Sequence, residues 1–207
     1  MFRIDLHNHT VYSGDSTLEP EEAVRRAVEL GLGGIAFTEH NTILDPDVTA
    51  RLGEKYKGAA VVLSGIEYTS REGHLLVFGY TDTGFGGLGL YGSATDLIRL
   101  VGERGGFVIP AHPFRGWSLF KGDLSALSGI AAIEAYNGHN TEEENEAAAL
   151  FAARRGIPTT GGSDSHDIDD VGRCCTEFSK PVEDLAGFIE ELKAGRFCGV
   201  CLRPPGY

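Results

Sequence analysis

The chain has 207 residues, of which 30 are acidic and 18 are basic, so its formal net charge is −12. Hydrophobic residues make up 42% of the chain and charged residues 23%, a composition that excludes global disorder and is typical of a globular protein with a sizeable core. The acidic balance argues against binding to duplex nucleic acid or to an anionic membrane surface, because both partners require clustered Lys and Arg.

The length predicts a single domain that spans residues 1–207. No apolar run approaches the roughly 18–20 residues that a membrane span needs. The N-terminus also lacks the basic and apolar pattern of a signal peptide. We therefore expect a cytoplasmic protein with no membrane partner.

Short β-rich runs alternate with helical patterns along the chain. Strands are predicted at 2–6, 34–38, 59–66, 74–80, 107–110, 130–135, 157–161 and 196–202. Helices are predicted at 21–30, 46–56, 94–104, 141–155 and 182–194. A hairpin is expected around Glu72 and Gly73, and the glycine-rich segment 83–92 is expected to be a mobile lid.

This alternation predicts an α/β fold with a largely parallel sheet. No GxGxxG or Walker-type loop follows the first strand, which disfavours an open nucleotide-binding sheet. A barrel is therefore favoured, with its site at the C-terminal ends of the strands.

The first predicted strand leads into Asp5-Leu6-His7-Asn8-His9. Side chains two positions apart in an extended chain point to the same face, so His7 and His9 could together hold a metal ion. Asp5 shares that face, and we expect it to accept a hydrogen bond from the second ring nitrogen of a ligating histidine.

Similar residues recur at the ends of later predicted strands. Together with the first motif, these positions give six histidines and three carboxylates: His7, His9, Asp15, His40, Glu67, His74, His112, Asp164 and His166. Nitrogen and oxygen ligands without sulfur suit Zn²⁺, Mn²⁺ or Fe²⁺, and nine of them exceed the needs of one ion. We therefore predict two or three divalent metal ions, with Glu67 as a bridging carboxylate.

Five motifs, in this order, resemble the PHP (polymerase and histidinol phosphatase) family of phosphoesterases. They are DLHNHT at 5–10, TEHN at 38–41, GIE at 65–67, AHP at 111–113 and GSDSH at 162–166. The resemblance implies a distorted (β/α)7 TIM-like barrel with three metal ions at its C-terminal face. One difference is that the acidic residue of the first loop, Asp15 in Ser13-Gly14-Asp15, comes one position later than in many family members.

The resemblance also implies three sets of metal ligands. These sets are His7, His9, Glu67 and Asp164 for one ion, Glu67, His74 and His112 for a second, and Asp15, His40 and His166 for a third.

The implied activity is metal-dependent hydrolysis of a small phosphate monoester or a short nucleotide. Clustered divalent ions would acidify a water molecule for attack on phosphorus and offset the charge of the phosphate. The predicted catalytic residues are Glu67, Asp164, His166 and Arg115. Arg115 follows the AHP motif and could bind a phosphate through two hydrogen bonds, while Arg173 and His139 are further candidates for substrate contact.

Three alternatives stay open. The first is a histidinol-phosphatase, which is an activity of some family members. The second is an amidohydrolase-type metal hydrolase, although such enzymes more often use a lysine at a strand end, which this chain lacks. The third is a PHP module that binds metal but has no catalytic activity.

The four cysteines are Cys174, Cys175, Cys198 and Cys201. Adjacent cysteines, and cysteines three apart in a strand, are poorly placed to ligate one ion together. We predict that they are small buried thiols in a reducing compartment.

Overall fold

A computed structural model describes residues 1–130 and 132–202. Ala131, which belongs to the predicted strand at 130–135, and residues 203–207 of the predicted single domain lie outside the described residues.

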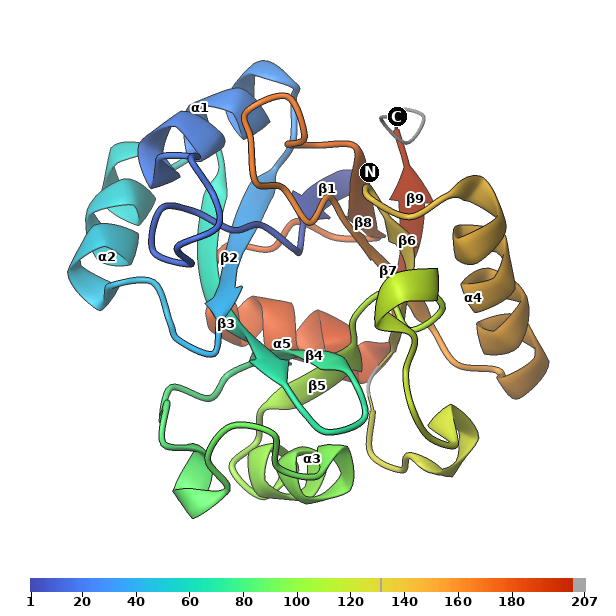
Figure 1. Ribbon diagram of the computed structural model, residues 1–207. Helices are drawn as coiled ribbons and strands as arrows, with labels where there is room; N and C mark the ends of the chain where they lie inside the picture. Colours follow the sequence, from blue (N-terminus) through green and yellow to red (C-terminus); the bar gives the residue numbers. More distant parts are fainter. Residues whose placement is uncertain (131, 203–207) are drawn as a thin grey trace.

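Seven strands form one curled sheet in the order β5-β4-β3-β2-β1-β8-β9, and β6 and β7 form a second sheet (Figure 1). The bounds are β1 Phe2–Asp5, β2 Gly34–His40, β3 Val61–Thr69, β4 His74–Phe78, β5 Phe107–Pro110, β6 Ile133–Asn137, β7 Thr159–Gly162, β8 Cys174–Phe178 and β9 Phe197–Cys201.

The expectation of a largely parallel, closed (β/α)7 barrel is only partly correct, because the described strands form a half-barrel in a mixed α/β fold. β1, β2 and β3 pair in parallel, but β3–β4, β4–β5, β1–β8 and β8–β9 are antiparallel. The predicted hairpin between β3 and β4 is confirmed, and its short turn leaves no room for the crossover helix that a parallel pair needs.

Among the described residues, the second sheet is joined to the first by an isolated parallel bridge between Asn8 and Ser165, beyond the ends of β1 and β7, and by side-chain contacts. The Thr176 hydroxyl on β8 accepts a hydrogen bond from Gly161 N on β7 at 2.9 Å and donates one to Gly161 O at 3.0 Å. These side-chain bonds add to the backbone bridge between Asn8 and Ser165 in connecting the two sheets.

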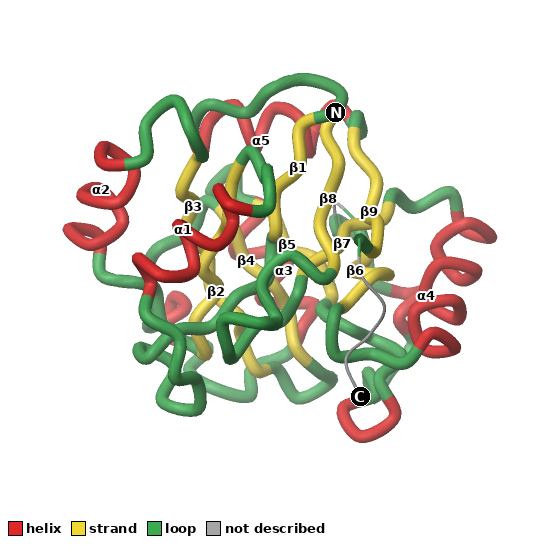
Figure 2. The backbone as a smooth tube through the Cα atoms, turned by 90° about the horizontal axis from the view of Figure 1, so that it is seen from above, coloured by secondary structure: helices red, strands yellow, loops and turns green. Residues whose placement is uncertain are grey.

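Five α-helices surround the strands. They are α1 Pro20–Glu29, α2 Pro46–Lys55, α3 Ala94–Gly102, α4 Glu142–Arg155 and α5 Leu185–Ala194. Figures 1 and 2 show α1 and α2 on one side of the strands and α4 on the opposite side. Among the helices of the described part of the chain, none is long and apolar enough to cross a membrane.

The helix ends follow local signals in the sequence. α1 begins at Pro20 and α2 begins at Pro46, positions at which the missing N–H of proline costs no helical hydrogen bond. Thr141 and Glu144 form a capping box at the start of α4, and Gly156 ends this helix with a φ of 62°. These signals explain why the predicted helices lie within a few residues of the observed ones.

The glycine-rich segment 83–92 is anchored at several points, which the expectation of a mobile lid did not foresee. Phe85 is fully buried and packs in the core with Tyr68 and Tyr80. The Tyr68 hydroxyl donates to Gly89 O at 2.6 Å and accepts from Gly92 N at 2.8 Å. These contacts oppose movement of the segment as one unit.

The expectation of four buried thiols is wrong for three of the cysteines. Cys174 and Cys201 form a disulfide, while Cys198 is an exposed thiol; only Cys175 is a buried thiol. The sequence analysis did not predict β8, and the antiparallel pairing of β8 with β9 places Cys174 directly opposite Cys201.

Candidate metal centre

The nine predicted ligands meet at one edge of the sheets. β1, β2, β3 and β5 run in the same direction, so their C-terminal ends lie together with the start of the antiparallel β4. A parallel bridge between Asn8 and Ser165 brings the segment after β7 to the same edge. The topology therefore collects motifs that are up to about 160 residues apart in the sequence.

Glu67 lies at the centre of this cluster and is only 1% exposed. Its Oε1 is 3.0 Å from His112 Nε2 and 2.9 Å from His74 Nδ1. Its Oε2 is 3.3 Å from His9 Nε2 and 2.8 Å from His40 Nδ1, yet lacks any partner in hydrogen-bond geometry. The carboxylate thus has a different set of histidines at each oxygen, as a bridging ligand requires.

Asp164 approaches the two histidines of the first motif. Its Oδ1 is 3.3 Å from His7 Nε2 and 3.2 Å from His9 Nε2, and the two Nε2 atoms are 3.1 Å apart. His7 and His9 are fully buried and Asp164 is 4% exposed. Three potential ligand atoms therefore converge at a point shielded from solvent.

A third group lies nearer to solvent. Asp15 Oδ2 is 3.0 Å from His40 Nε2 and 3.5 Å from His166 Nε2. The side chains of Asp15, His40 and His166 are 51%, 26% and 30% exposed. The later position of the acidic residue in its loop does not prevent Asp15 from reaching both histidines.

The donor set fits divalent metal ions. Four groups of three residues have ligand atoms within 4.8 Å of one another: His9, His40 and His166; His7, His112 and Asp164; His7, His9 and Glu67; and Glu67, His74 and His112. The unpartnered Oε2 of Glu67 is a second sign of fit, because a buried carboxylate oxygen is costly unless a cation or donor meets it. The structure thus brings all nine residues together, while their roles as ligands stay predictions.

The charges of the cluster are strongly coupled. Burial lowers the pKa of His9, but the nearby carboxylates of Asp164 and Glu67 outweigh it and raise the pKa to about 9. The pKa of His7 is also raised, because Asp164, Glu134 and Glu67 outweigh burial. Burial alone would raise the pKa values of Glu67 and Asp164, but the facing histidines hold both values well below the usual range.

Part of the cluster lies on unusual backbone. Asn41, His112 and Asp164 have positive φ values of 56°, 30° and 56°. Such conformations cost roughly 1–3 kcal/mol each for residues other than glycine and tend to gather at functional sites. The surrounding contacts therefore hold these residues in place against a local preference.

Arg115, predicted to contact phosphate, is directed instead at protein groups. It is 3% exposed, and its Nη2 donates to Asp164 Oδ2 at 2.7 Å and to Asn137 Oδ1 at 2.6 Å. Its Nε donates to Asn140 Oδ1 at 2.8 Å. Arg115 thus holds the Asp164 oxygen that faces away from His7 and His9.

Arg173 and His139, the other two residues predicted to contact substrate, both lie beside Asp170. Arg173 is 3.0 Å and His139 is 3.3 Å from the carboxylate of Asp170. The His139 ring centroid lies 6.0 Å from that of His166, so His139 borders the solvent-facing group. Contact of either residue with substrate stays a prediction.

Asp5 does not accept from an imidazole, contrary to expectation. Its carboxylate is fully buried and accepts from Ser163 N at 2.8 Å and Gly172 N at 2.9 Å, so it holds the loop before and after Asp164. Burial raises the pKa of Asp5 to about 6.

Sequence reasoning also missed residues behind the histidines. Glu134 lies 3.0 Å from His7 Nδ1, Ser13 Oγ lies 3.1 Å from His9 Nδ1, and Ser118 Oγ lies 3.2 Å from His112 Nδ1. An acidic residue within the apolar run around Ile133 was the one available signal for Glu134.

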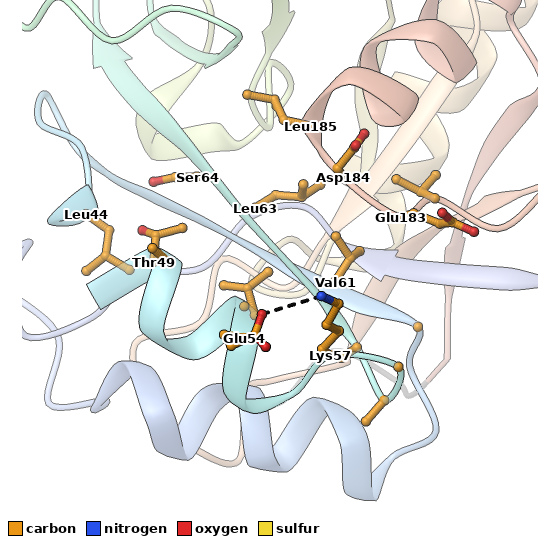
Figure 3. A pocket seen from close by; sticks show the side chains of 18 of the residues that line it. Leu44, Thr49, Glu54, Lys57, Val61, Leu63, Ser64, Glu183, Asp184 and Leu185 are labelled. Carbon is orange, nitrogen blue, oxygen red and sulfur yellow. Dashed lines mark ion pairs between the residues drawn. The ribbon is translucent and has the colours of Figure 1, made fainter. Parts of the chain in front are cut away.

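A large cavity lies elsewhere on the molecule, as Figure 3 shows. It has a volume of about 820 Å³ and is lined by residues that include Leu44, Val61, Leu63 and Leu185, with the Glu54–Lys57 ion pair among them. Val61 begins β3, whereas Glu67 lies toward its other end, so this cavity is separate from the histidine cluster.

Comparisons with known proteins agree with the motifs. A profile of the PHP domain matches residues 5–101, and a profile described as PHP-associated matches residues 142–197. An uncharacterized protein of Methanocaldococcus jannaschii is 30% identical over 150 residues, which cover 68% of this chain and 84% of that protein.

Two solved structures share the fold. A candidate metal-dependent phosphoesterase from Bifidobacterium adolescentis superposes with a TM-score of 0.67 at 22% identity, covering 92% of this chain and 95% of the other. PsfC from Pseudomonas syringae superposes with a TM-score of 0.72 at 20% identity, covering 97% of this chain and 92% of the other. At these identities the likeness extends to the fold alone.

Proposed function

The chain belongs to the PHP family, and on that premise we propose that it is a metal-dependent phosphoesterase that hydrolyses a small phosphate monoester or a short nucleotide. The observation that carries the proposal is the position of Glu67 between two sets of histidines, with Asp164 completing the buried side. Such an arrangement suits two or more divalent ions that share one carboxylate.

The proposal assigns the buried ligands to two ions and the exposed ones to a third. His7, His9, Glu67 and Asp164 would hold one ion, Glu67, His74 and His112 a second, and Asp15, His40 and His166 a third. Bound divalent ions would lower the pKa of a water molecule and offset the charge of the phosphoryl group.

The remaining residues orient the site. Arg115 holds one oxygen of Asp164, which leaves the other oxygen directed at His7 and His9. Solvent exposure of Asp15, His40 and His166 leaves this side accessible to a substrate. Arg115 and Arg173 are already paired with Asp164 and Asp170, so neither arginine supplies an unpaired positive charge for a long polyanion beside the cluster.

We also propose that the whole chain acts as one domain, related to a distorted TIM-like barrel. The two matched profiles contribute to the same site, since His7 and Glu67 lie in the first and Asp164 in the second, while His112 lies between them. Neither profiled segment alone would complete the predicted ligand sets.

The test combines metal analysis with a substrate screen. Purified protein would be assayed for bound metal and, with Mn²⁺ added, for phosphate release from monoesters, diesters and histidinol phosphate. We expect at least two ions per chain and metal-dependent release from a small ester. His7→Ala and Asp164→Ala should each abolish release, with thermal melting used to confirm that the variants fold.

Fewer than two ions and no release from any substrate would refute the proposal. Full metal binding without release would instead support a PHP module that has no catalytic activity.

A further inference from the structure

Glu134 is a fully buried carboxylate on β6 that lies outside the predicted ligand sets. Its Oε1 lies 3.0 Å from His7 Nδ1. Because an ionised carboxylate can only accept, this contact requires the proton of His7 to reside on Nδ1. A metal ion would then bind the opposite nitrogen, Nε2, which lies beside His9 Nε2 and Asp164 Oδ1.

The second oxygen of Glu134 holds another part of the site. Its Oε2 accepts from the backbone N–H of His112 at 2.8 Å and from Asn137 Nδ2 at 3.0 Å. The backbone of His112 has a φ of 30°, so this bond stabilises a conformation that the chain would otherwise avoid.

Asn137 extends this network to Asp164. Asn137 Oδ1 accepts from Arg115 Nη2 at 2.6 Å, and the same nitrogen donates to Asp164 Oδ2 at 2.7 Å. Asn137 Nδ2 also donates to Asp164 Oδ2 at 3.4 Å, so Glu134 contacts His7 and His112 directly and reaches Asp164 through the single side chain of Asn137.

Packing also holds the Glu134 carboxylate in place. A Cβ atom at Gly162 would lie 2.9 Å from Glu134 Oε1 and 2.4 Å from the Cβ of His7. Glycine at this position therefore leaves the space in which the Glu134–His7 contact forms.

We propose that Glu134 is a positioning residue for the metal centre, because it fixes the ring proton of His7 and holds His112 and Asn137 in one arrangement. The inference rests on the proposed function in that it assumes metal binding by His7 and His112. The His112 N–H and Asn137 Nδ2 donate to Glu134, and with the proposed tautomer His7 Nδ1 does so too, so a carboxylate satisfies all three groups and an amide does not.

The substitution Glu134→Gln tests this requirement with little change in shape. Its amide would place an N–H against either His7 or the donors from His112 and Asn137. We expect Mn²⁺ affinity, measured by calorimetry on metal-stripped protein, to fall by roughly 10–100-fold. Glu177→Gln is the matched control, since Glu177 is also a largely buried carboxylate but pairs with Arg3 near the start of β1, whereas the cluster follows the end of β1.

Equal Mn²⁺ affinity in Glu134→Gln and the unaltered protein would overturn the proposal. If Glu134→Gln fails to fold, the unaltered Zn²⁺-loaded protein provides the test by proton–nitrogen correlation spectra of its histidine rings. A proton on Nδ1 of His7 supports the proposal, and a proton on Nε2 refutes it. Both measurements are independent of phosphate release, so absence of enzymatic activity would count against the proposed function and not against this role of Glu134.

Discussion

Arg115 was expected to bind phosphate, but it is buried and forms hydrogen bonds with other side chains of the protein. Its position after the AHP motif favoured contact with phosphate, but its hydrogen bonds hold Asp164, Asn137 and Asn140. A residue that positions a ligand should affect catalysis more than substrate binding.

We therefore predict that Arg115→Lys lowers kcat with little change in KM. Lysine keeps the charge but cannot reproduce the planar set of donors. Loss of one charged hydrogen bond, worth about 1.5–3 kcal/mol, corresponds to roughly a 10–100-fold lower rate. Steady-state kinetics on the best phosphate ester would measure the effect, with the exposed Arg99→Lys as control. A raised KM at unchanged kcat would instead indicate direct contact with phosphate.

The histidine pKa values predict that metal binding releases protons. The pKa of His9 is raised from 6.5 to about 9, so metal-free protein carries a proton there at pH 7. The raised pKa of His9 means that its protonation stabilises the folded, metal-free protein. This stabilisation is fully present below pH 6.5 and is lost as the pH rises through about 9. By contrast, burial lowers the pKa of His112, which therefore has no proton to lose at pH 7.

Metal affinity should accordingly rise about ten-fold per pH unit for each proton released, over the range from pH 6.5 to about 9. Calorimetric titration with Mn²⁺ in buffers of different ionisation enthalpy would count the protons. A binding enthalpy that does not depend on the buffer would contradict the prediction.

At the scale of elements, the sequence predicted all five α-helices of the described residues and all their strands except β8, but not the three short 3-10 helices. Hydrophobic runs and helix-end signals such as Pro20 and Gly156 act locally, so they can be read from a single sequence. β8 was missed, and strand direction was partly wrong, because pairing depends on contacts between distant segments. The residues of β8 form a strand because they pair with β1 on one side and with β9 on the other.

The missed strand carries the disulfide, which supplies a test of the β8–β9 pairing. Cys174 and Cys201 are separated by 27 positions, and closure of a loop of this size stabilises a fold by about 3–4 kcal/mol in the chain-entropy account. We expect Cys201→Ser to lower the free energy of unfolding by about this amount. The substitution Cys198→Ser, which alters an exposed free thiol, should change it by less than about 0.5 kcal/mol.

Urea unfolding with and without a reducing agent would measure both variants. The reducing agent should destabilise the unaltered protein and leave Cys201→Ser unaffected. Equal stability of the unaltered protein in both conditions would show that the two cysteines are not joined.

At the scale of the whole molecule, the sequence indicated which residues form the candidate metal centre, but not which side chains position them. The motif histidines and carboxylates could be located because all of them except Asp15, which lies in a loop, are at or near the end or start of a predicted strand, and the structure brings them to one edge. Glu134 and the role of Asp5 were not predictable, since their partners depend on how β6 and β7 approach β1. Side-chain hydrogen bonds across such a junction leave no periodic pattern in the sequence.

The cluster also changes how the net charge of −12 is interpreted. Asp15, Glu67 and Asp164 belong to the predicted ligand sets and not to the general surface, and Glu67 and Asp164 are buried. Three divalent ions would add 3 × 2 = +6 and leave about −6. The site would then be a local positive region on an acidic protein, which suits one phosphate group better than a polyanion.

Because the predicted ligands come from β2, β3, β4 and the segments after β1, β5 and β7, bound metal should connect most of the fold. Ions that bind only the folded state stabilise it by about 2.7 kcal/mol per site at a concentration 100 times the Kd. For a protein of this length, that corresponds to a rise in Tm of roughly 5–10 °C.

We therefore expect removal of metal by a chelator to lower Tm by at least this amount, and added Mn²⁺ to restore it. His7→Ala should reduce the metal-dependent shift, because it removes a ligand of one predicted ion, whereas His139→Ala, which lies outside the predicted ligand sets, should retain the full shift. A shift of equal size in both variants would mean that the stabilising ions bind elsewhere on the protein.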